Sequence, residues 1–148
     1  MGDLRSTAQR RADVLATFEQ HGHAWLATAA GSVPHVIVTQ VVWDGESIVV
    51  ATRGSSRTAR NLDESQAGRF AFGDSDDAIV VDVELAKSLP ATVAGDTGAT
   101  FQRAAGWDPA KQGADWRYFV LRPSRIQAYR GYGEIEGREV MKDGRWLA

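Results

Sequence analysis

The 148-residue sequence contains no cysteine. This absence excludes disulfide frameworks, thiolate nucleophiles and cysteine-based zinc sites. A chain of this length can bury roughly 70% of its unfolded surface in one core, so it needs neither disulfides nor a metal for stability. We therefore expect one domain over residues 1–148. The lack of cysteine also fits a reducing compartment, and we expect a cytoplasmic protein.

Long hydrophobic runs and an excess of positive charge are absent as well. No segment approaches the ~20 consecutive apolar residues of a membrane-spanning helix, so we expect no membrane association. The formal net charge is −2, whereas nucleic-acid-binding domains are usually strongly basic. We therefore predict that nucleic acid is not a partner.

Signatures of hydrolases and metalloproteins are also missing. There is no GxSxG elbow, and neither Ser55 nor Ser56 has a recognisable general base. His21 and His23 straddle a glycine without further ligands in pattern, and the acidic turn at 74–77 lacks the spacing of an EF-hand. We predict no metal site and no catalytic side chain.

The sequence is rich in short β-type segments with few helices between them. Strands are predicted at 23–30, at 35–43 and 46–52 around Asp44-Gly45 as a type I′ turn, within 68–87 around an acidic turn, and at 116–130 as a hairpin turning at 122–125. Helices are predicted at 6–20 with Ser6 or Thr7 as the cap, at 56–65, and at 96–106 with Asp96 or Thr97 as the cap and Gly106 as the terminator. Six or seven short strands predict a mostly β protein, a small antiparallel barrel with flanking helices.

The segment 35–43 is apolar on both of its alternating faces, with Ile37, Val41 and Trp43 on one and Val36, Val38 and Val42 on the other. A half-exposed antiparallel strand would instead alternate apolar with polar residues. The second face must therefore be covered by an outer layer of the barrel, by a ligand or by another subunit. This pattern favours a homodimer.

Cations and hydroxyl groups gather in "TRGSSRTARNLDES" (52–65), where a predicted strand leads into a predicted helix. The N–H groups at a helix start are unpaired and favour an anion. Arg53 and Arg57 can bind phosphate with two hydrogen bonds each, and Gly54 allows a close backbone approach. The hydroxyl donors are Ser55, Ser56 and Thr58. The stretch therefore suits a phosphate group, with an ordinary capped helix and solvated arginines as the alternative.

A resemblance to a known family follows from the order of several motifs. A helix, an "LAT" strand, the "VPHVIVTQVVWDG" hairpin and "ATRGSSRTARNL" together resemble the split-barrel flavoproteins of the pyridoxamine 5′-phosphate oxidase-like superfamily, closest to the actinobacterial flavin/deazaflavin oxidoreductases. "GWDP" (106–109) and "RIQAYRGYGEIEGREVMKDGRWL" (125–147) extend the resemblance over nearly the whole chain. It implies a six-stranded antiparallel split β-barrel that forms a homodimer, with FMN or the deazaflavin coenzyme F420 in a groove at the subunit interface. The actinobacterial relatives favour F420.

The resemblance also implies where the cofactor is bound. Residues near the cofactor phosphate would be Ser56, Arg57, Thr58 and Asn61. Residues beside the ring would be Val36, Ile37, Val38, Ala51 and Thr52. Arg53 and Ser55 complete the candidate cofactor-binding set. Many relatives carry lysine where this chain has Thr58, and the paired arginine and lysine that bind substrate in authentic pyridoxamine-phosphate oxidases are not recognisable, which argues against vitamin B6 oxidation.

We therefore predict a flavin-type oxidoreductase that uses F420 or FMN to transfer hydride or electrons to or from a small conjugated substrate. The cofactor would carry the chemistry. The alternative is a non-catalytic cofactor- or anion-binding protein on the same fold, used for storage, transport or sensing. Two further points stay open: the segment 96–105 is either a lid or a surface cap, and Trp146 could cover the site from a partner chain.

Overall fold

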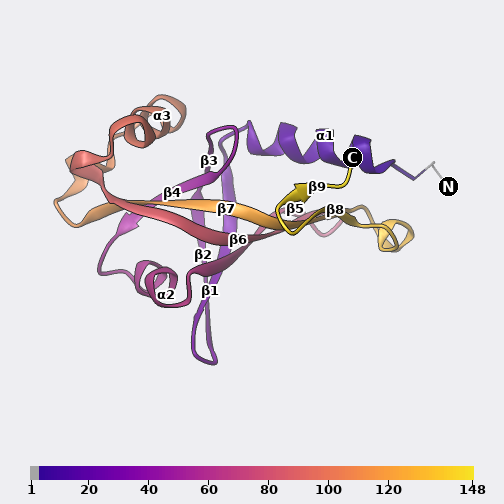
Figure 1. Ribbon diagram of the computed structural model, residues 1–148, viewed down its shortest axis with the longest axis horizontal. Coiled ribbons are helices and arrows are strands. Elements are labelled where there is room, and N and C mark those ends of the chain that lie inside the picture. The colour runs from indigo at the N-terminus through magenta and orange to yellow at the C-terminus, as the bar shows by residue number, and fades with distance from the viewer. Residues whose placement is uncertain (1–3) are drawn as a thin grey trace.

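The computed structural model describes residues 4–148 and is mostly β (Figure 1). The helices are α1 (Thr7–Phe18), α2 (Arg57–Ser65) and α3 (Gly95–Ala105), with 3₁₀ turns η1 (Ala91–Val93), η2 (Pro109–Gln112) and η3 (Tyr132–Glu134). The strands are β1 (His23–Ala30), β2 (Val33–Gln40), β3 (Val42–Trp43), β4 (Ile48–Arg53), β5 (Ala67–Asp74), β6 (Asp77–Pro90), β7 (Trp116–Tyr129), β8 (Glu139–Lys142) and β9 (Arg145–Trp146). Within this range, every helix is too short or too polar to cross a membrane.

All strands belong to one antiparallel sheet with the order β2-β1-β5-β6-β7-β4-β3, and the β8–β9 hairpin pairs beside β7. The end strands β2 and β3 are separated in the sequence by Val41 alone. The sheet must therefore curl until its two ends approach each other. The predicted antiparallel split barrel is confirmed: β1, β2 and β4–β7 correspond to the six expected strands, and three shorter strands are added.

The main core fills the inside of the curled sheet. Helix α1 contributes Val14 and Phe18, and α2 contributes Leu62, all of them buried. Phe18 packs against Phe72 with ring centroids 5.2 Å apart. The two helices lie on opposite sides of the long β6–β7 ribbon (Figure 1). The predicted flanking helices are confirmed, and α1 and α2 both contribute side chains to the barrel core.

A second core covers the outer face of β4 and β7. Phe101 of α3 packs on Tyr118 with ring centroids 5.2 Å apart, and Trp107 makes edge contacts with Phe101 and Trp116. Helix α3 therefore acts as a cap over this layer rather than as a lid over an open cleft. This cover reaches β2 only at Gln40, whose Oε1 accepts from Trp107 Nε1 at 2.9 Å, and Val36 and Val38 on the same outer face stay exposed in a single chain.

The prediction of a hairpin within 116–130 is wrong. β7 runs continuously through Pro123, and Ser124 forms a bulge because Val83 pairs with Pro123 while Asp82 pairs with Arg125. A proline cannot donate to a ladder and is tolerated in a strand where a bulge interrupts the pairing. The Arg-Pro-Ser-Arg stretch therefore bends one long strand and does not reverse the chain.

The type I′ turn predicted at Asp44-Gly45 is also wrong. Asp44 Oδ1 accepts hydrogen bonds from the N–H groups of Glu46 (2.8 Å) and Ser47 (2.6 Å), which builds a longer connection in which only Gly45 has positive φ. The type I′ pattern, with positive φ at both central residues, occurs instead at Asp143-Gly144 between β8 and β9 (φ 52° and 76°).

The helix caps were predicted with mixed success. Ser6 caps α1 in a capping box with Gln9, and Gly106 ends α3 with φ 83°, as expected. The cap predicted at Asp96 or Thr97 is wrong, because α3 begins directly after η1 with Ala94 at its N-cap and no side-chain cap.

Candidate functional site

The predicted site lies at the corner where β4 ends and α2 begins. Ser56 is the N-cap of α2, and its Oγ accepts from the Ala59 N–H at 3.0 Å. Thr52 Oγ1 donates to the same Ser56 Oγ at 3.1 Å, and this hydrogen bond joins the end of β4 to the start of α2. A serine cap of this kind is what the sequence Ser-Arg-Thr-Ala favours.

The corner presents hydrogen-bond donors to solvent. Within residues 4–148, the N–H groups of Arg57 and Thr58 have no hydrogen-bond partner, as expected for the first turn of a helix. The side chains of Arg53 and Arg57 are exposed beside them. The exposed guanidinium groups of Arg53 and Arg57 therefore lie beside the positive end of the α2 dipole, an arrangement suited to an anion.

Thr58 and Asn61 lie on the opposite, inward side of α2. Each is only 2% exposed. Asn61 Nδ2 donates to Thr28 Oγ1 of β1 at 3.1 Å in a buried hydrogen bond. The Asn61 hydrogen bond joins α2 to β1, and neither side chain lines the exposed surface of the corner.

The predicted ring-binding residues do not share one face. Val36 and Val38 point to the outer surface of β2, whereas Ile37 packs against the main core. On β4, Ala51 packs against the second core and Thr52 turns to the corner. A flat ligand along these strands would therefore meet the main chain and alternate side chains.

The sequence analysis missed Asp115, which returns to this corner from the start of β7. Ser55 donates to Asp115 Oδ2 from its N–H (3.2 Å) and its Oγ (2.7 Å), and Gly54 N–H donates to the Asp115 carbonyl at 2.7 Å. The Ser55 hydrogen bonds, supported by the charges of Arg53 and Arg117, lower the pKa of Asp115. No sequence signal links positions 55 and 115.

Gly54 permits this close approach. A Cβ at this position would lie 3.0 Å from Asp115 Oδ1 and 3.1 Å from Arg117 Cδ. A side chain at position 54 would therefore require the Asp115 and Arg117 side chains to shift by a few tenths of an ångström. The glycine that the sequence analysis assigned to ligand approach therefore accommodates another segment of the same chain.

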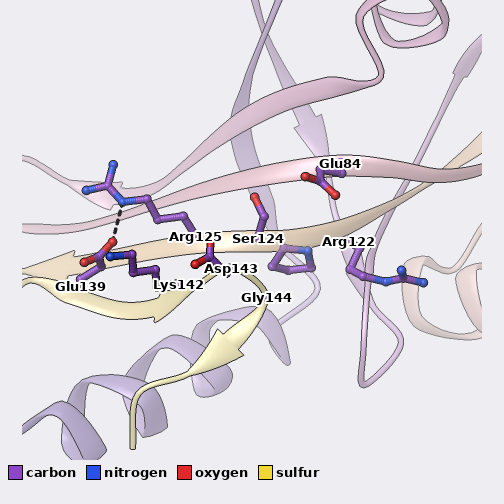
Figure 2. Close-up of a pocket in the computed structure, with 9 residues that line it drawn as sticks. Glu84, Arg122, Ser124, Arg125, Glu139, Lys142, Asp143 and Gly144 are labelled. Carbon is purple, nitrogen blue, oxygen red and sulfur yellow. Dashed lines mark hydrogen bonds and ion pairs between the residues drawn. The ribbon is translucent and has the colours of Figure 1, made fainter.

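The cavities of the single chain lie elsewhere. One of about 680 Å³ is at the β7 bulge, where Arg125 Nε pairs with Glu139 Oε1 at 2.9 Å (Figure 2). In that view Arg122 points away from the Arg125–Glu139 pair, and charges of both signs line the space. Another of about 550 Å³ lies beside Arg69 and the end of α2. Neither cavity is lined by a predicted cofactor-binding residue.

His21 has a structural role at the entry to β1. His21 Nδ1 accepts from the Trp43 N–H at 3.1 Å, which fixes the entry to β1 beside β3. Over residues 4–148, no group of three or more histidine, aspartate or glutamate side chains is arranged to hold a metal ion.

Comparisons with known proteins give the fold. No protein-family model matches the sequence. No curated protein matches it either. Among solved structures, an F420 reductase superposes with a TM-score of 0.62 at 22% identity, over 75% of this chain and 93% of its own.

Two further structures agree with that result. A pyridoxamine 5′-phosphate oxidase candidate from Listeria innocua has a TM-score of 0.64 at 12% identity, over 79% of this chain and 95% of its own. An FAD-binding protein from Mesorhizobium loti has a TM-score of 0.63 at 10% identity, over 80% of this chain and 90% of its own. At these identities the likeness concerns the fold. The chain has the split-barrel fold of the pyridoxamine 5′-phosphate oxidase-like superfamily.

Proposed function

We propose that this protein is a flavin-type oxidoreductase that binds F420 or FMN with the cofactor phosphate at the β4–α2 corner. The observation that carries the proposal is the set of donors at that corner: the exposed guanidinium groups of Arg53 and Arg57, with the N–H group of Arg57, which has no hydrogen-bond partner within residues 4–148. Solved proteins of the same fold include an F420 reductase and an FAD-binding protein. Together they favour a phosphorylated tricyclic ligand.

The strands before the corner suit the ring of such a ligand. β2 lies at one end of the strand order and pairs only with β1, so the main-chain groups along its other edge lack a strand partner in the described part of the chain. The N–H groups along such an edge can donate hydrogen bonds to a planar ligand. Such donors, aimed at the pyrimidine side of the ring, would stabilise negative charge on the reduced cofactor.

In this proposal the bound cofactor supplies hydride or electron transfer, and no side chain acts as acid, base or nucleophile. The chain's own contribution is threefold. Arg53 and Arg57 bind the phosphate, the β2 main chain orients the ring, and apolar side chains around it exclude water. Solvent supplies the proton that a reduced substrate requires.

We propose that a second copy of the chain completes the site. Trp25, Val36 and Val38 are 55%, 55% and 51% exposed on the outer face of β1 and β2, with Trp25 directly opposite Val38. An exposed apolar strip of this kind is typical of an interface. The predicted ring-binding residues line neither of the two cavities described above, which a groove between two copies would explain.

Between the two cofactors, we favour F420. The reported neighbour with the highest identity, at 22%, is an F420 reductase. The deazaflavin restricts the reaction to two-electron hydride transfer, whereas FMN also allows reaction with oxygen. A small conjugated acceptor fits hydride chemistry.

The test is a titration of the purified protein with F420 and, separately, with FMN, followed by tryptophan fluorescence. Trp25 stands beside the proposed ring strand, so binding should quench the emission, and Trp25→Phe should lose much of that quench. Calorimetry on the wild-type protein and on Trp25→Phe then shows whether a smaller quench reflects loss of the tryptophan or loss of cofactor binding. Absence of heat and of quenching with both cofactors would contradict the proposal.

One observation favours a second candidate, a non-catalytic cofactor carrier. Position 58 holds a buried threonine, so the corner has no lysine there to hold the phosphate. Turnover distinguishes the two functions. Protein loaded with reduced cofactor is mixed with a panel of quinones, enones and tetrapyrroles; reoxidation by any of them supports the enzyme, and none supports the carrier.

A further inference from the structure

The carboxylate of Asp115 occupies donors of Ser55 at the corner that a bound phosphate could also use. Its Oδ2 accepts from both the N–H and the Oγ of Ser55, at 3.2 and 2.7 Å. Phosphate oxygens use the same donor types, an N–H and a hydroxyl in the turn before a helix. A carboxylate and a phosphate cannot both hold these donors, because two anions at this distance repel each other.

We propose that Asp115 is a specificity-determining residue of this corner: its carboxylate holds the Ser55 donors in the free protein, and a phosphate group binds by displacing it. The inference rests on the proposed function, since it assigns a role toward the same phosphate. It goes beyond that function by assigning to Asp115, from another part of the chain, competition with the phosphate for the Ser55 donors.

The geometry allows displacement without unfolding. The main chain of Asp115 is held separately, because its carbonyl accepts from the Gly54 N–H at 2.7 Å. Rotation of the Asp115 side chain alone therefore frees the Ser55 donors, while the β7 segment stays in place. The Ser55–Asp115 hydrogen bonds are also exposed, so water weakens them and can replace them.

The positive charges around Asp115 make its displacement selective for a phosphate group. Arg53 and Arg117 lie close enough to Asp115 to act on its charge. When a phosphate takes the Ser55 donors, these cations can turn to it. A phosphate monoester carries nearly two negative charges at neutral pH, whereas a carboxylate ligand carries one and gains little by replacing Asp115. The corner should therefore favour phosphorylated over carboxylated ligands.

The experiment compares FMN with riboflavin, which lacks the phosphate, on wild-type protein and on Asp115→Asn. The variant keeps the shape of the side chain but loses its charge. We expect it to bind FMN about fivefold more tightly, the size of one surface charge interaction, with unchanged riboflavin affinity. F420 is titrated beside FMN, and a smaller increase is expected because its phosphate is a diester with a single negative charge. Asp96→Asn, which removes an exposed charge on α3, is the matched control and should change neither affinity.

A second readout reports on Asp115 directly. The ¹³C NMR signal of its carboxyl group should move toward that of a solvated aspartate when FMN binds, and should stay unchanged with riboflavin. Equal or weaker FMN binding by Asp115→Asn, with wild-type protein still preferring FMN to riboflavin, overturns the inference and leaves the proposed function standing. Equal tightening for FMN and riboflavin also overturns it. No binding of FMN or F420 by either protein overturns both.

Discussion

Arg5 and Glu134 form a buried ion pair that joins the start of the described chain to the turn after β7. Arg5 Nη2 lies 2.6 Å from Glu134 Oε1, and the Arg5 N–H donates to Oε2 at 3.0 Å. The Arg130 N–H donates to the same carboxylate at 2.8 Å. These contacts fix α1 against the barrel, where Phe18 enters the main core.

The Glu134 pair predicts an acid-sensitive fold. Its hydrogen bonds, first of all those from the Arg5 side chain, lower the pKa of Glu134 from 4.5 to about 2. A carboxyl group with a lower pKa in the folded state stabilises that state above its unfolded pKa, and the stabilisation is lost as the pH falls toward the folded value. Denaturant unfolding at several pH values should show stability declining from about pH 5 toward pH 2.

The control for this prediction is Glu134→Gln, which cannot change its charge. At pH 7 we expect it to cost roughly 2 kcal/mol, because the buried Arg5 guanidinium loses the nearer of its two carboxylate partners and keeps only Asp13. Between pH 5 and 2 its stability should fall less steeply than that of the wild type. Parallel pH profiles for the two proteins would show that Glu134 is not the responsible group.

The Asn61–Thr28 hydrogen bond predicts a coupled loss of stability. Asn61→Ala should lower the free energy of unfolding by about 2 kcal/mol, since it leaves the buried Thr28 hydroxyl without a donor. Thr28→Val should cost less in that background than in the wild type, because no hydrogen bond is left to break. A double-mutant cycle measures the difference; additive effects would mean that the two side chains do not interact in solution.

Gly73 and Gly144 have similar left-handed φ angles, 81° and 76°, in different surroundings. A Cβ on Gly73 would lie 2.1 Å from the Asp77 carbonyl oxygen, whereas a Cβ on Gly144 would meet nothing within 4 Å. We expect Gly144→Ala to cost about 1 kcal/mol from backbone strain, and Gly73→Ala about 3 kcal/mol from strain and collision. Equal costs in thermal unfolding would show that the β5–β6 turn adjusts freely.

The exposed strip on β2 predicts a homodimer that a single charge disrupts. Val38→Lys should shift sedimentation from dimer to monomer at micromolar concentration, because an unpaired lysine would be buried against the partner. Val93→Lys is the matched control, since Val93 is 71% exposed on η1. A monomeric wild type, or a Val38→Lys protein that stays dimeric, would assign this strip another role.

Local signals in the sequence predicted the elements well where one residue controls the backbone. Ser6, one of the two caps predicted for the first helix, caps α1, and Gly106 ends α3 as predicted. The same signals failed where a side chain hydrogen-bonds to the backbone nearby and so changes the type of turn. Asp44 folds its carboxylate onto the following N–H groups, and the Asp143-Gly144 pair forms the turn predicted at Asp44-Gly45.

Long-range contacts explain the rest of what the sequence could not predict. Pro123 suggested a turn, but its place beside Val83 in the sheet makes it part of a bulge. The corner itself was found from its arginines and serines, whereas Asp115 reaches it only because β7 pairs with β4 up to Arg53. The inward side of α2 was not foreseen either, since burial of Thr58 depends on β1 packing against that helix.

The central claim is that the β4–α2 corner binds the phosphate of the cofactor. The affinity of Arg57→Ala for FMN and for riboflavin tests this claim most directly. Arg103→Ala on α3 is the charge-matched control. We expect Arg57→Ala to weaken FMN binding about tenfold, through loss of a charged hydrogen bond at an exposed site, and to leave riboflavin binding unchanged. Arg103→Ala should change neither affinity. An FMN affinity that is unchanged in Arg57→Ala, while wild-type protein prefers FMN to riboflavin, would place the phosphate elsewhere and contradict the account.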